Sequence, residues 1–569
     1  MSMPVITNKV DIKINRDNLF YDYDIIRISN SENYIGYDSP LLDEVKKDKN
    51  VCSVLYRGGY NMYILYKGNA RDFKLEDDDI SVNCDYDLPD DYIAQLLLNS
   101  LNSNGICNLT GHCYCFNPEW VSIKKDEIYK IVGLEINIKE TLTINVKTFT
   151  KTTKDKSKGL AMYEIGPNYT LKRTNAKEGF VIRHPGNKKS FVPFFSFRDE
   201  DYYDNSKLGI LNKILEQLEK KYGYIMKLNF ETIDEYIALD HKKAIDLPSF
   251  DNVVISGVNE NYKNRLKEII EHDYGIVARL EDKPNKDALN FVVLPHNKEY
   301  YKDNENETDP YENIPGYVIQ HLTVEDCDIY KTKGYIPVLR TLICNLLMKR
   351  DIKERRISFI NWSDYGFEHN VKFAKIIDAK TKNISDNKMV IMNVHPNGTF
   401  DIETISTDYS LIFNEKYAKY ADVVYLKNTK GFVVDHNDNI NIIYDTDLMT
   451  LPMFQKIGTE LKESEDGKIC IRSKEKREEL LYSCLDIKFY EKDGKYYYFA
   501  GIIGKGMNST IPRASKIRNI ELHKDSDIIF EDMLQMMDVT FVRNNQLTVM
   551  PFPFKYIDLY QSNMFSSIF

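Results

Sequence analysis

The stretch DNVVISGVNENYKNRLKEIIEHDYGIVARLEDKPNKDALNFVVLP, residues 251–295, decides the fold. Its first part (251–257) is typical of a short strand, and residues 259–275 have the apolar spacing of an amphipathic helix. ALNFVVLP (288–295) is a continuous apolar run, as expected for a strand covered on both faces of a parallel sheet. Strand, helix and strand in this order predict a right-handed crossover unit of an α/β domain.

The flanking sequence extends this pattern in both directions. Residues 1–150 favour strands with one helix, DDYIAQLLLNSLNSNG (90–105), and a second amphipathic helix, SKLGILNKILEQLEKKYG, is expected at 206–223. C-terminal to the opening stretch we expect alternating helices and strands. The expected helices are 338–349 and 530–543, and the expected strands are 371–378, 388–396, 421–428 and 495–504.

Composition is that of an ordinary globular protein of several domains, with 569 residues of which 43% are hydrophobic and 28% charged. No run reaches the ~18 apolar residues of a membrane span, and the first residues lack the apolar core of a secretory signal. We therefore expect a cytoplasmic protein without a membrane partner, whose nine scattered cysteines are reduced.

The net charge of −10 argues mildly against a nucleic-acid partner, because phosphate binding favours basic surfaces. A binding groove needs only local positive charge, however, and the chain has two basic clusters. A solvated charged face is the alternative explanation for such runs. The clusters are Lys349, Arg350, Lys353, Arg355 and Arg356, and Arg513, Lys516 and Arg518.

Three stretches carry a resemblance to a known family. LPHNKEYYKDNENETDPYENIPGYVIQHLT (294–323) contains Tyr301 and Gln320, and CNLLMKRDIK (344–353) contains Asn345, Lys349 and Lys353. The third stretch (508–560) has Pro512, Arg543, Pro551, Pro553 and Tyr556 at characteristic positions. In this order and spacing, the stretches resemble the MID and PIWI domains of the Argonaute/Piwi family.

The resemblance implies a bilobed α/β multidomain architecture with a Rossmann-like MID domain, an RNase H-like PIWI domain and a β-rich N-terminal region. The expected ranges are 1–150 for the N-like domain, 151–245 for a linker region with a reduced or absent PAZ domain, 246–355 for MID and 356–569 for PIWI. It further implies a short guide DNA or RNA, bound by its 5′ end and paired with a complementary target strand.

For the 5′ end of the guide, the resemblance names Tyr301, Gln320, Asn345, Lys349 and Lys353. Lysines four residues apart share one face of a helix, so two ammonium groups, an amide and a stacking ring would suit a terminal phosphate and its base. Exposed surface lysines are the alternative. A Mg²⁺ ion at the guide end is the one cofactor left open, and Arg350, Arg513, Lys516 and Arg543 are the expected contacts to the strand's backbone.

One position in the same loop departs from the family pattern. Glu305 occupies the place of a basic residue that normally contacts the 5′ phosphate. A carboxylate would repel that phosphate, so we expect weak discrimination between phosphate and hydroxyl guide ends. The alternative is that Lys298 or Lys302 reaches the pocket instead.

The nuclease site of an active family member needs about four acidic or histidine ligands around two Mg²⁺ ions. The first position falls on Asp378, the third near Lys427 and the fourth near Ile503, so only one of three placeable positions is acidic. The second position cannot be placed, with Glu403 and Glu415 as candidates by proximity alone. We therefore expect no catalytic residues, no bound metal and no enzyme activity.

Asp435 is an alternative third acid if the register shifts by a few residues, and it would favour an active guide-directed endonuclease. A protein-interaction module on a degenerate PIWI scaffold is the other competing hypothesis. Catalytically inactive prokaryotic Argonautes usually act in defence against plasmids or phages. They do so through a separate effector such as a helicase-nuclease or a TIR, Sir2 or nuclease subunit, and we expect the same role here by analogy.

Three further patterns have structural explanations. Cys107, His112, Cys113 and Cys115 lack the second pair of a zinc site and favour buried cysteines. The aromatic run 496–499 is more typical of a half-buried strand than of a base-stacking platform. HNDN (436–439) indicates a turn and not a calcium loop.

Overall fold

The computed structural model forms two compact units, each described here by itself. The first contains Met1–Ala238, Thr446–Tyr490 and Phe499–Ile517, and the second contains Leu239–Asp445, Glu491–Tyr498 and Arg518–Phe569. The residues that the structure describes are 4–29, 40–57, 60–76, 81–101, 114–115, 128–136, 141–152, 161–165, 171–175, 180–183, 192–239, 246–303, 310–311, 314–331, 334–377, 387–464, 479–480, 487–500, 510–511, 514–539 and 549–565.

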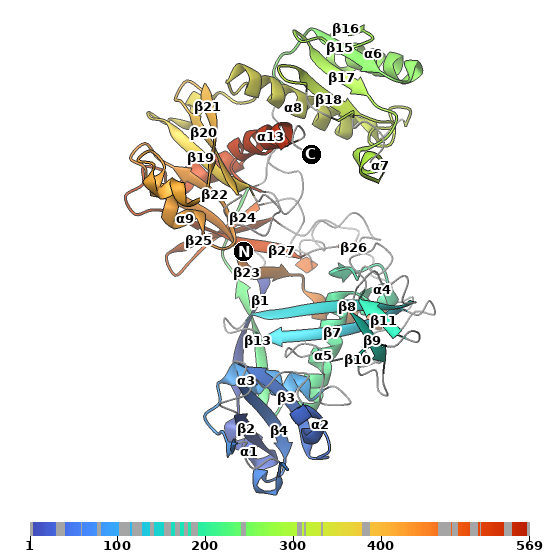
Figure 1. The fold of residues 1–569 in the computed structure, drawn as a ribbon, viewed down its shortest axis with the longest axis vertical. Helices are drawn as coiled ribbons and strands as arrows, with labels where there is room; N and C mark the ends of the chain where they lie inside the picture. The colour runs from blue at the N-terminus through green and yellow to red at the C-terminus, as the bar shows by residue number, and fades with distance from the viewer. Residues whose placement is uncertain are drawn as a thin grey trace. The chain divides into compact units, whose positions relative to one another are not determined.

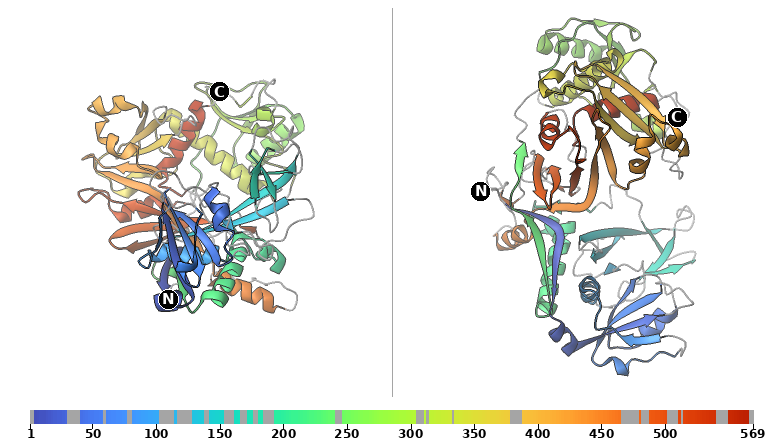
Figure 2. Two further views of the ribbon diagram at one scale, coloured as in Figure 1. Left: turned by 60° about the horizontal axis from the view of Figure 1, so that its bottom comes forward. Right: turned by 90° about the vertical axis from the view of Figure 1, so that its left-hand side faces the viewer.

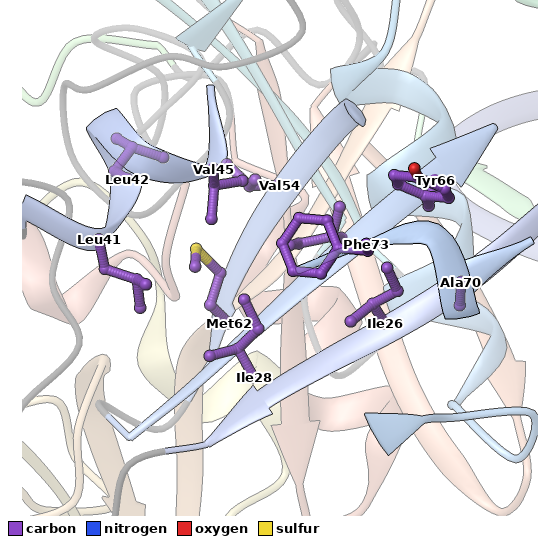
Figure 3. Close-up of a cluster of buried hydrophobic side chains, with 11 residues drawn as sticks. Ile26, Ile28, Leu41, Leu42, Val45, Val54, Met62, Tyr66, Ala70 and Phe73 are labelled. Carbon is purple, nitrogen blue, oxygen red and sulfur yellow. The ribbon is translucent and has the colours of Figure 1, made fainter. Parts of the chain in front are cut away.

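The first unit begins with an antiparallel sheet in the order β3-β4-β2-β5. Figure 3 shows side chains from the sheet, from α2 and from the turn after β4 gathered in one apolar cluster, with Met62 and Phe73 among them. Residues Met62–Tyr66 of β4 are all buried, and α3 also packs against β3 and β4, so both faces of this strand are covered. The elements are β1(Val5–Ile14), α1(Arg16–Asp22), β2(Tyr23–Ser29), α2(Pro40–Val45), β3(Val51–Arg57), β4(Asn61–Lys67), η1(Ala70–Asp72), β5(Ser81–Cys84) and α3(Asp90–Asn99).

The rest of the first unit has a second antiparallel sheet in the order β10-β9-β11-β8-β7-β6, and the expected long helix is confirmed as α5. Ser206 caps α5 by accepting a hydrogen bond from the Gly209 amide, and Gly223 follows its last residue, as the sequence predicts. The elements are β6(Tyr114–Cys115), β7(Ile128–Ile136), β8(Leu142–Thr152), β9(Met162–Ile165), β10(Leu171–Thr174), β11(Phe180–Arg183), β12(Phe195–Ser196), α4(Glu200–Asp204), α5(Lys207–Tyr222), β13(Met226–Ile233), β14(Ile237–Leu239), α10(Phe454–Glu463), β24(Ile487–Lys492) and β26(Thr510–Ile511).

The second unit opens with the sheet that the deciding stretch predicts. All three pairs in the order β16-β15-β17-β18 are parallel, which confirms the α/β crossover arrangement. α6 packs against β15 and β16, and α8 packs against β17 and β18 (Figure 1). The elements are β15(Val253–Gly257), α6(Glu260–Tyr274), β16(Ala278–Leu280), β17(Leu289–Val293), α7(Lys298–Asp303), β18(Val318–Leu322) and α8(Tyr335–Glu354).

Part of an 11-stranded sheet also belongs to this unit, with its strands in the order β25-β27-β23-β22-β19-β20-β21. The register is antiparallel for the pairs β19–β20, β20–β21, β19–β22, β22–β23 and β25–β27. The RNase H-like character expected here stays a prediction, since antiparallel pairs do not distinguish it from other helix-covered sheets. The elements are η5(Trp362–Tyr365), β19(Val371–Ile377), β20(Lys388–Val394), β21(Phe400–Ser406), η7(Tyr409–Phe413), η8(Ala418–Tyr420), α9(Ala421–Val424), β22(Thr429–Val434), β23(Ile440–Leu451), β25(Lys495–Ala500), β27(Ser515–Glu521), α12(Phe530–Met537) and α13(Pro553–Phe565).

One predicted strand is wrong. Residues 421–428 form the short helix α9 and a turn, and not a strand. Tyr420 and Val424, four residues apart, both enter the apolar cluster beside β19 and β22. Helical spacing therefore buries this segment's apolar side chains against the sheet, which overrides the strand preference of its two valines.

The C-terminal helix α13 packs between the antiparallel strands of the second unit and α8, the helix that covers its parallel sheet. It packs against β19 and β20 on one side and against α8 on another, and Figure 2 shows it in red beside these strands. Phe554 meets Phe373 of β19 edge to face, while the Tyr556 hydroxyl donates to Oδ2 of the fully buried Asp351 of α8 over 2.8 Å. Asp351 also accepts from the Ser358 amide and hydroxyl, so its carboxylate is fully engaged.

The four expected domain ranges stay predictions. The second unit holds all of 246–355, whereas the first unit takes two segments of the expected PIWI range. Within the described part of the chain, no helix is both long enough and apolar enough to cross a membrane.

Candidate nucleic-acid interface

The predicted guide-end residues belong to the parallel sheet of the second unit. Lys349 lies on α8 where this helix covers β18, and its Nζ donates to the Ile319 carbonyl oxygen over 2.6 Å. The same Nζ lies 3.4 Å from Gln320 Oε1, so the structure brings these two predicted residues together. Burial of the ammonium lowers the pKa of Lys349 from 10.5 to about 8.

Asn345 lies one turn before Lys349 on the same face of α8 and is half-buried. The Gln320 amide is fixed from its other end, because Nε2 donates to the His321 carbonyl oxygen over 2.9 Å. Its Oε1 is thereby held toward Lys349. Lys349 and Gln320 thus lie together at β18, with Asn345 one helical turn away on α8, and all three side chains carry N–H donors that an anion could accept from.

Tyr301 follows the carboxyl end of β17, in α7, where it is only 8% exposed. Its ring lies 6.0 Å from that of Tyr311, which in turn lies 5.2 Å from the ring of His321 on β18. His296 stacks on Tyr300 with 3.9 Å between centroids and an interplanar angle of 22°. We call these five rings the aromatic cluster. Ligands of open α/β sheets bind at the carboxyl ends of the strands, where this cluster lies.

Lys353 lies apart from Lys349 and Gln320. Its exposed ammonium donates to the Lys286 carbonyl oxygen over 2.9 Å. Lys286 precedes β17, so Lys353 lies at the amino end of the sheet and Tyr301 at the carboxyl end. One helical turn advances ~6 Å along α8, which is enough for each lysine to reach a different carbonyl of the sheet.

Arg350 was expected to contact the strand's backbone, but it is engaged within the protein. Its Nη1 donates to the Ser249 carbonyl oxygen and its Nη2 to Ser358 Oγ, both over 3.0 Å. The guanidinium also lies 3.7 Å from Asp351 Oδ1. These contacts fix the end of α8 and occupy most of the N–H donors of the Arg350 guanidinium, so few remain for a ligand.

The other expected backbone contacts give less information. Lys516 lies exposed on β27, whereas Arg513 and Arg543 lie outside the described residues. Arg518, from the same basic cluster, is buried, and its Nε donates to Asp445 Oδ1 over 2.9 Å. Lys430 pairs with the other oxygen of Asp445, so this arginine belongs to a buried ion network and not to a phosphate surface.

The positions of the expected nuclease acids are only partly described. Asp378 and Ile503 lie outside the described residues, and Lys427 is exposed in the turn between α9 and β22. Glu403 on β21 accepts from Lys416 Nζ over 2.7 Å and from the Tyr417 hydroxyl over 2.6 Å, whereas Glu415 is exposed. Nothing in the described part of the chain joins these positions into one site.

Asp435, the alternative third acid, organises a turn. It is buried, and its carboxylate accepts from the Asn439 amide, the Asn439 side chain and the Asp527 amide. Burial alone raises the pKa of Asp435, but these hydrogen bonds outweigh burial and lower it. The turn expected at 436–439 is confirmed, with Asp438 in the left-handed region at φ 67°.

The donors near Lys349 do not fit a Mg²⁺ ion. Mg²⁺ prefers carboxylate and water oxygens in an octahedral shell, and here the single amide oxygen of Gln320 already accepts from an ammonium. Among the residues that the structure describes, no three His, Cys, Asp or Glu side chains gather as metal ligands.

The structure also describes parts of the Cys/His group, the aromatic run and the loop around Glu305. Cys107, His112 and Cys113 lie outside the described residues, and Cys115 lies on the two-residue strand β6. The aromatic run is confirmed as a half-buried strand, β25, in which Tyr498 and Phe499 are buried. The loop position Glu305 is not described, nor is the side chain of Lys302, while Lys298 is exposed at the start of α7.

Sequence reasoning missed most of the aromatic cluster. Tyr300, Tyr311, His296 and His321 were not singled out, because each is an unremarkable residue in a polar loop or a strand. The signal was present in the position of the loop: ring-bearing residues following the carboxyl end of a predicted parallel strand.

Comparisons with known proteins add little to this geometry. No protein-family model matches the chain, and no curated protein matches it. Among solved structures, the crystal structure of Drosophila Piwi is similar over 97% of this chain and 96% of that chain, with 10% sequence identity and a TM-score of 0.43.

Proposed function

We propose that this protein binds the end of a short single-stranded nucleic acid along β18 of its parallel sheet. The observation that carries the proposal is the ammonium of Lys349, which is partly desolvated beside Gln320 on β18, the strand that also carries His321 of the aromatic cluster. A phosphate would compensate for the lost solvation of this ammonium, since charged hydrogen bonds strengthen in a low-dielectric site. Aromatic rings accept bases by stacking without regard to sequence.

The chemistry divides between two neighbouring groups. Lys349, with the amides of Gln320 and Asn345, would hold the terminal phosphate, and the half-buried Tyr300 and His296 would stack the first base. Base pairing to a second strand would then supply sequence recognition, because the protein contacts the strand and not its base edges. DNA and RNA both satisfy this chemistry.

We further propose that the protein does not cut the strands it holds. The sequence offers no acid at the third and fourth expected positions, and the Asp435 carboxylate already accepts hydrogen bonds from Asn439 of its own turn and from the Asp527 amide. A role in defence against plasmids or phages, with a separate effector protein that acts on the target, extends this proposal by analogy to inactive prokaryotic Argonautes.

Fluorescence anisotropy with a labelled single strand tests the binding proposal. The protein should bind the strand in the absence of divalent ions, and adding Mg²⁺ or Mn²⁺ with a complementary strand should release no product. Absence of binding would contradict the first proposal, and a guide-dependent product of defined length would contradict the second.

A further inference from the structure

Lys555 is a buried lysine in the first turn of α13, with 8% of the residue exposed. Among the described residues, no acceptor or carboxylate lies within bonding distance of its ammonium. Burial lowers the pKa of Lys555, the nearby Lys375 lowers it further, and Asp558 acts in the opposite direction. Buried cations are normally paired, so an unpaired one marks a place where a ligand can supply the missing charge.

A second lysine and a carboxylate lie beside it. Lys375 of β19 forms an ion pair with Asp558 of α13, whose side chains are 31% and 42% exposed. Asp558 follows Lys555 by three residues and so lies on the same helix face. The one carboxylate is bonded to Lys375 and only lies near Lys555, so this cluster of two ammonium groups has a net positive charge, and Lys375 and Asp558 are partly exposed to solvent.

The helix itself adds to this positive charge. α13 has 13 residues and starts at Pro553, and side chains of a first turn tilt toward the helix N-terminus. The amides of Phe554 and Lys555 already donate to the carbonyl oxygens of Pro551 and Phe552. The helix end therefore contributes its dipole, and the donors for an anion would be the two ammonium groups.

We propose that Lys555 and Lys375 form a phosphate site that holds an internucleotide phosphate of the bound single strand. The inference rests on the proposed function and adds a second point of attachment to it. α13 carries both this site and Tyr556, which bonds to α8 two residues beyond Lys349. One helix thus positions the phosphate site and contacts the helix that holds the strand's end.

Lys555→Met is the test, because methionine keeps the apolar stem and removes the charge. A buried and unpaired charge destabilises the protein when no ligand is bound, so removing it in this variant should raise the Tm. It should also bind a labelled single strand about tenfold more weakly, with the slope of log affinity against log salt reduced by about one. Lys495→Met, an exposed lysine of β25, is the matched control and should change neither quantity.

The outcomes separate this inference from the proposed function. Tight binding by both Lys555→Met and Lys375→Met overturns the phosphate site and leaves the proposed function standing. No strand binding by the unmodified protein overturns the proposed function, and then a Tm increase with inorganic phosphate that Lys555→Met lacks would still support the phosphate site. If Lys555→Met does not fold, Lys555→Arg should fold and keep its affinity, and weak binding by that charge-conserving variant would overturn the inference.

Discussion

Replacing Lys349 by methionine should separate its role in binding from its role in the fold. The ammonium donates to the Ile319 carbonyl oxygen and lies near Gln320 Oε1, and the pKa of Lys349 falls from 10.5 to about 8. At ~1.4 kcal/mol per pKa unit, keeping the charge there costs the fold about 3 kcal/mol at neutral pH. The variant loses the two contacts and also loses this cost, so we expect a stability change below about 1 kcal/mol.

Binding should respond much more strongly than stability. A hydrogen bond from an ammonium to a phosphate contributes ~1.5–3 kcal/mol, which corresponds to about a 10- to 100-fold loss of affinity for a 5′-phosphorylated strand. Affinity for the 5′-hydroxyl strand should fall by less than about threefold, since its terminal group carries no charge for Lys349 to pair with.

Competition anisotropy with the two strands at pH 7 measures these affinities, and urea unfolding measures stability. Lys353→Met is the matched control, because it removes a lysine one turn along α8 that bonds to the Lys286 carbonyl at the other end of the sheet. Equal losses in both variants would refute the placement of the phosphate at Lys349. So would a loss of affinity that only follows a loss of folded protein.

Four further predictions concern the pH dependence of Lys349, the buried Tyr556 hydroxyl and the loop position Glu305. Only the protonated lysine binds phosphate, so affinity for the phosphorylated strand should fall about tenfold per pH unit above pH 8 and should be flatter in Lys349→Met, as a pH titration would show. The unfolded chain binds more protons than the fold between pH 8 and 10.5, so the stability of the unmodified protein should rise across this window relative to Lys349→Met in urea unfolding; a parallel pair of curves would contradict the lowered pKa. Tyr556→Phe removes a donor to the buried Asp351 and should lower the stability by ~1–3 kcal/mol without changing strand affinity; unchanged stability in urea unfolding would contradict this assignment. Glu305→Lys should increase the preference for a phosphorylated end in competition binding, and an unchanged preference would contradict the placement of Glu305.

The parallel sheet could be predicted because its strands are continuous apolar runs and its first helix has clear end signals. Asn259 caps α6 and Gly275 ends it in the left-handed conformation at φ 69°, and both are readable from residue type. The segment 421–428 could not be predicted, because two valines and a tyrosine suit a strand equally well. Its helical form depends on the cluster that Tyr420 and Val424 enter, which is a tertiary contact.

The candidate site shows the same division. Sequence spacing placed Lys349 and Lys353 on one helix face, which is correct, but spacing does not say which strand end each lysine reaches. The sequence placed Arg350 among the expected contacts to the strand's backbone and Arg518 in a basic cluster, whereas the fold gives them Ser358 and Asp445 as partners. Net charge and spacing do not identify these hydrogen-bond and ion-pair partners, because some of them come from segments far apart in the sequence.

Photo-cross-linking of a single strand with a photoreactive first base tests the central claim most directly, with peptide mapping by mass spectrometry. The account predicts cross-links to His296, Tyr300, Tyr301 or Tyr311, and a lower yield in Lys349→Met than in Lys353→Met. Cross-links confined to other parts of the chain, or the same yield in both variants, would contradict the claim that this sheet holds the end of a nucleic-acid strand.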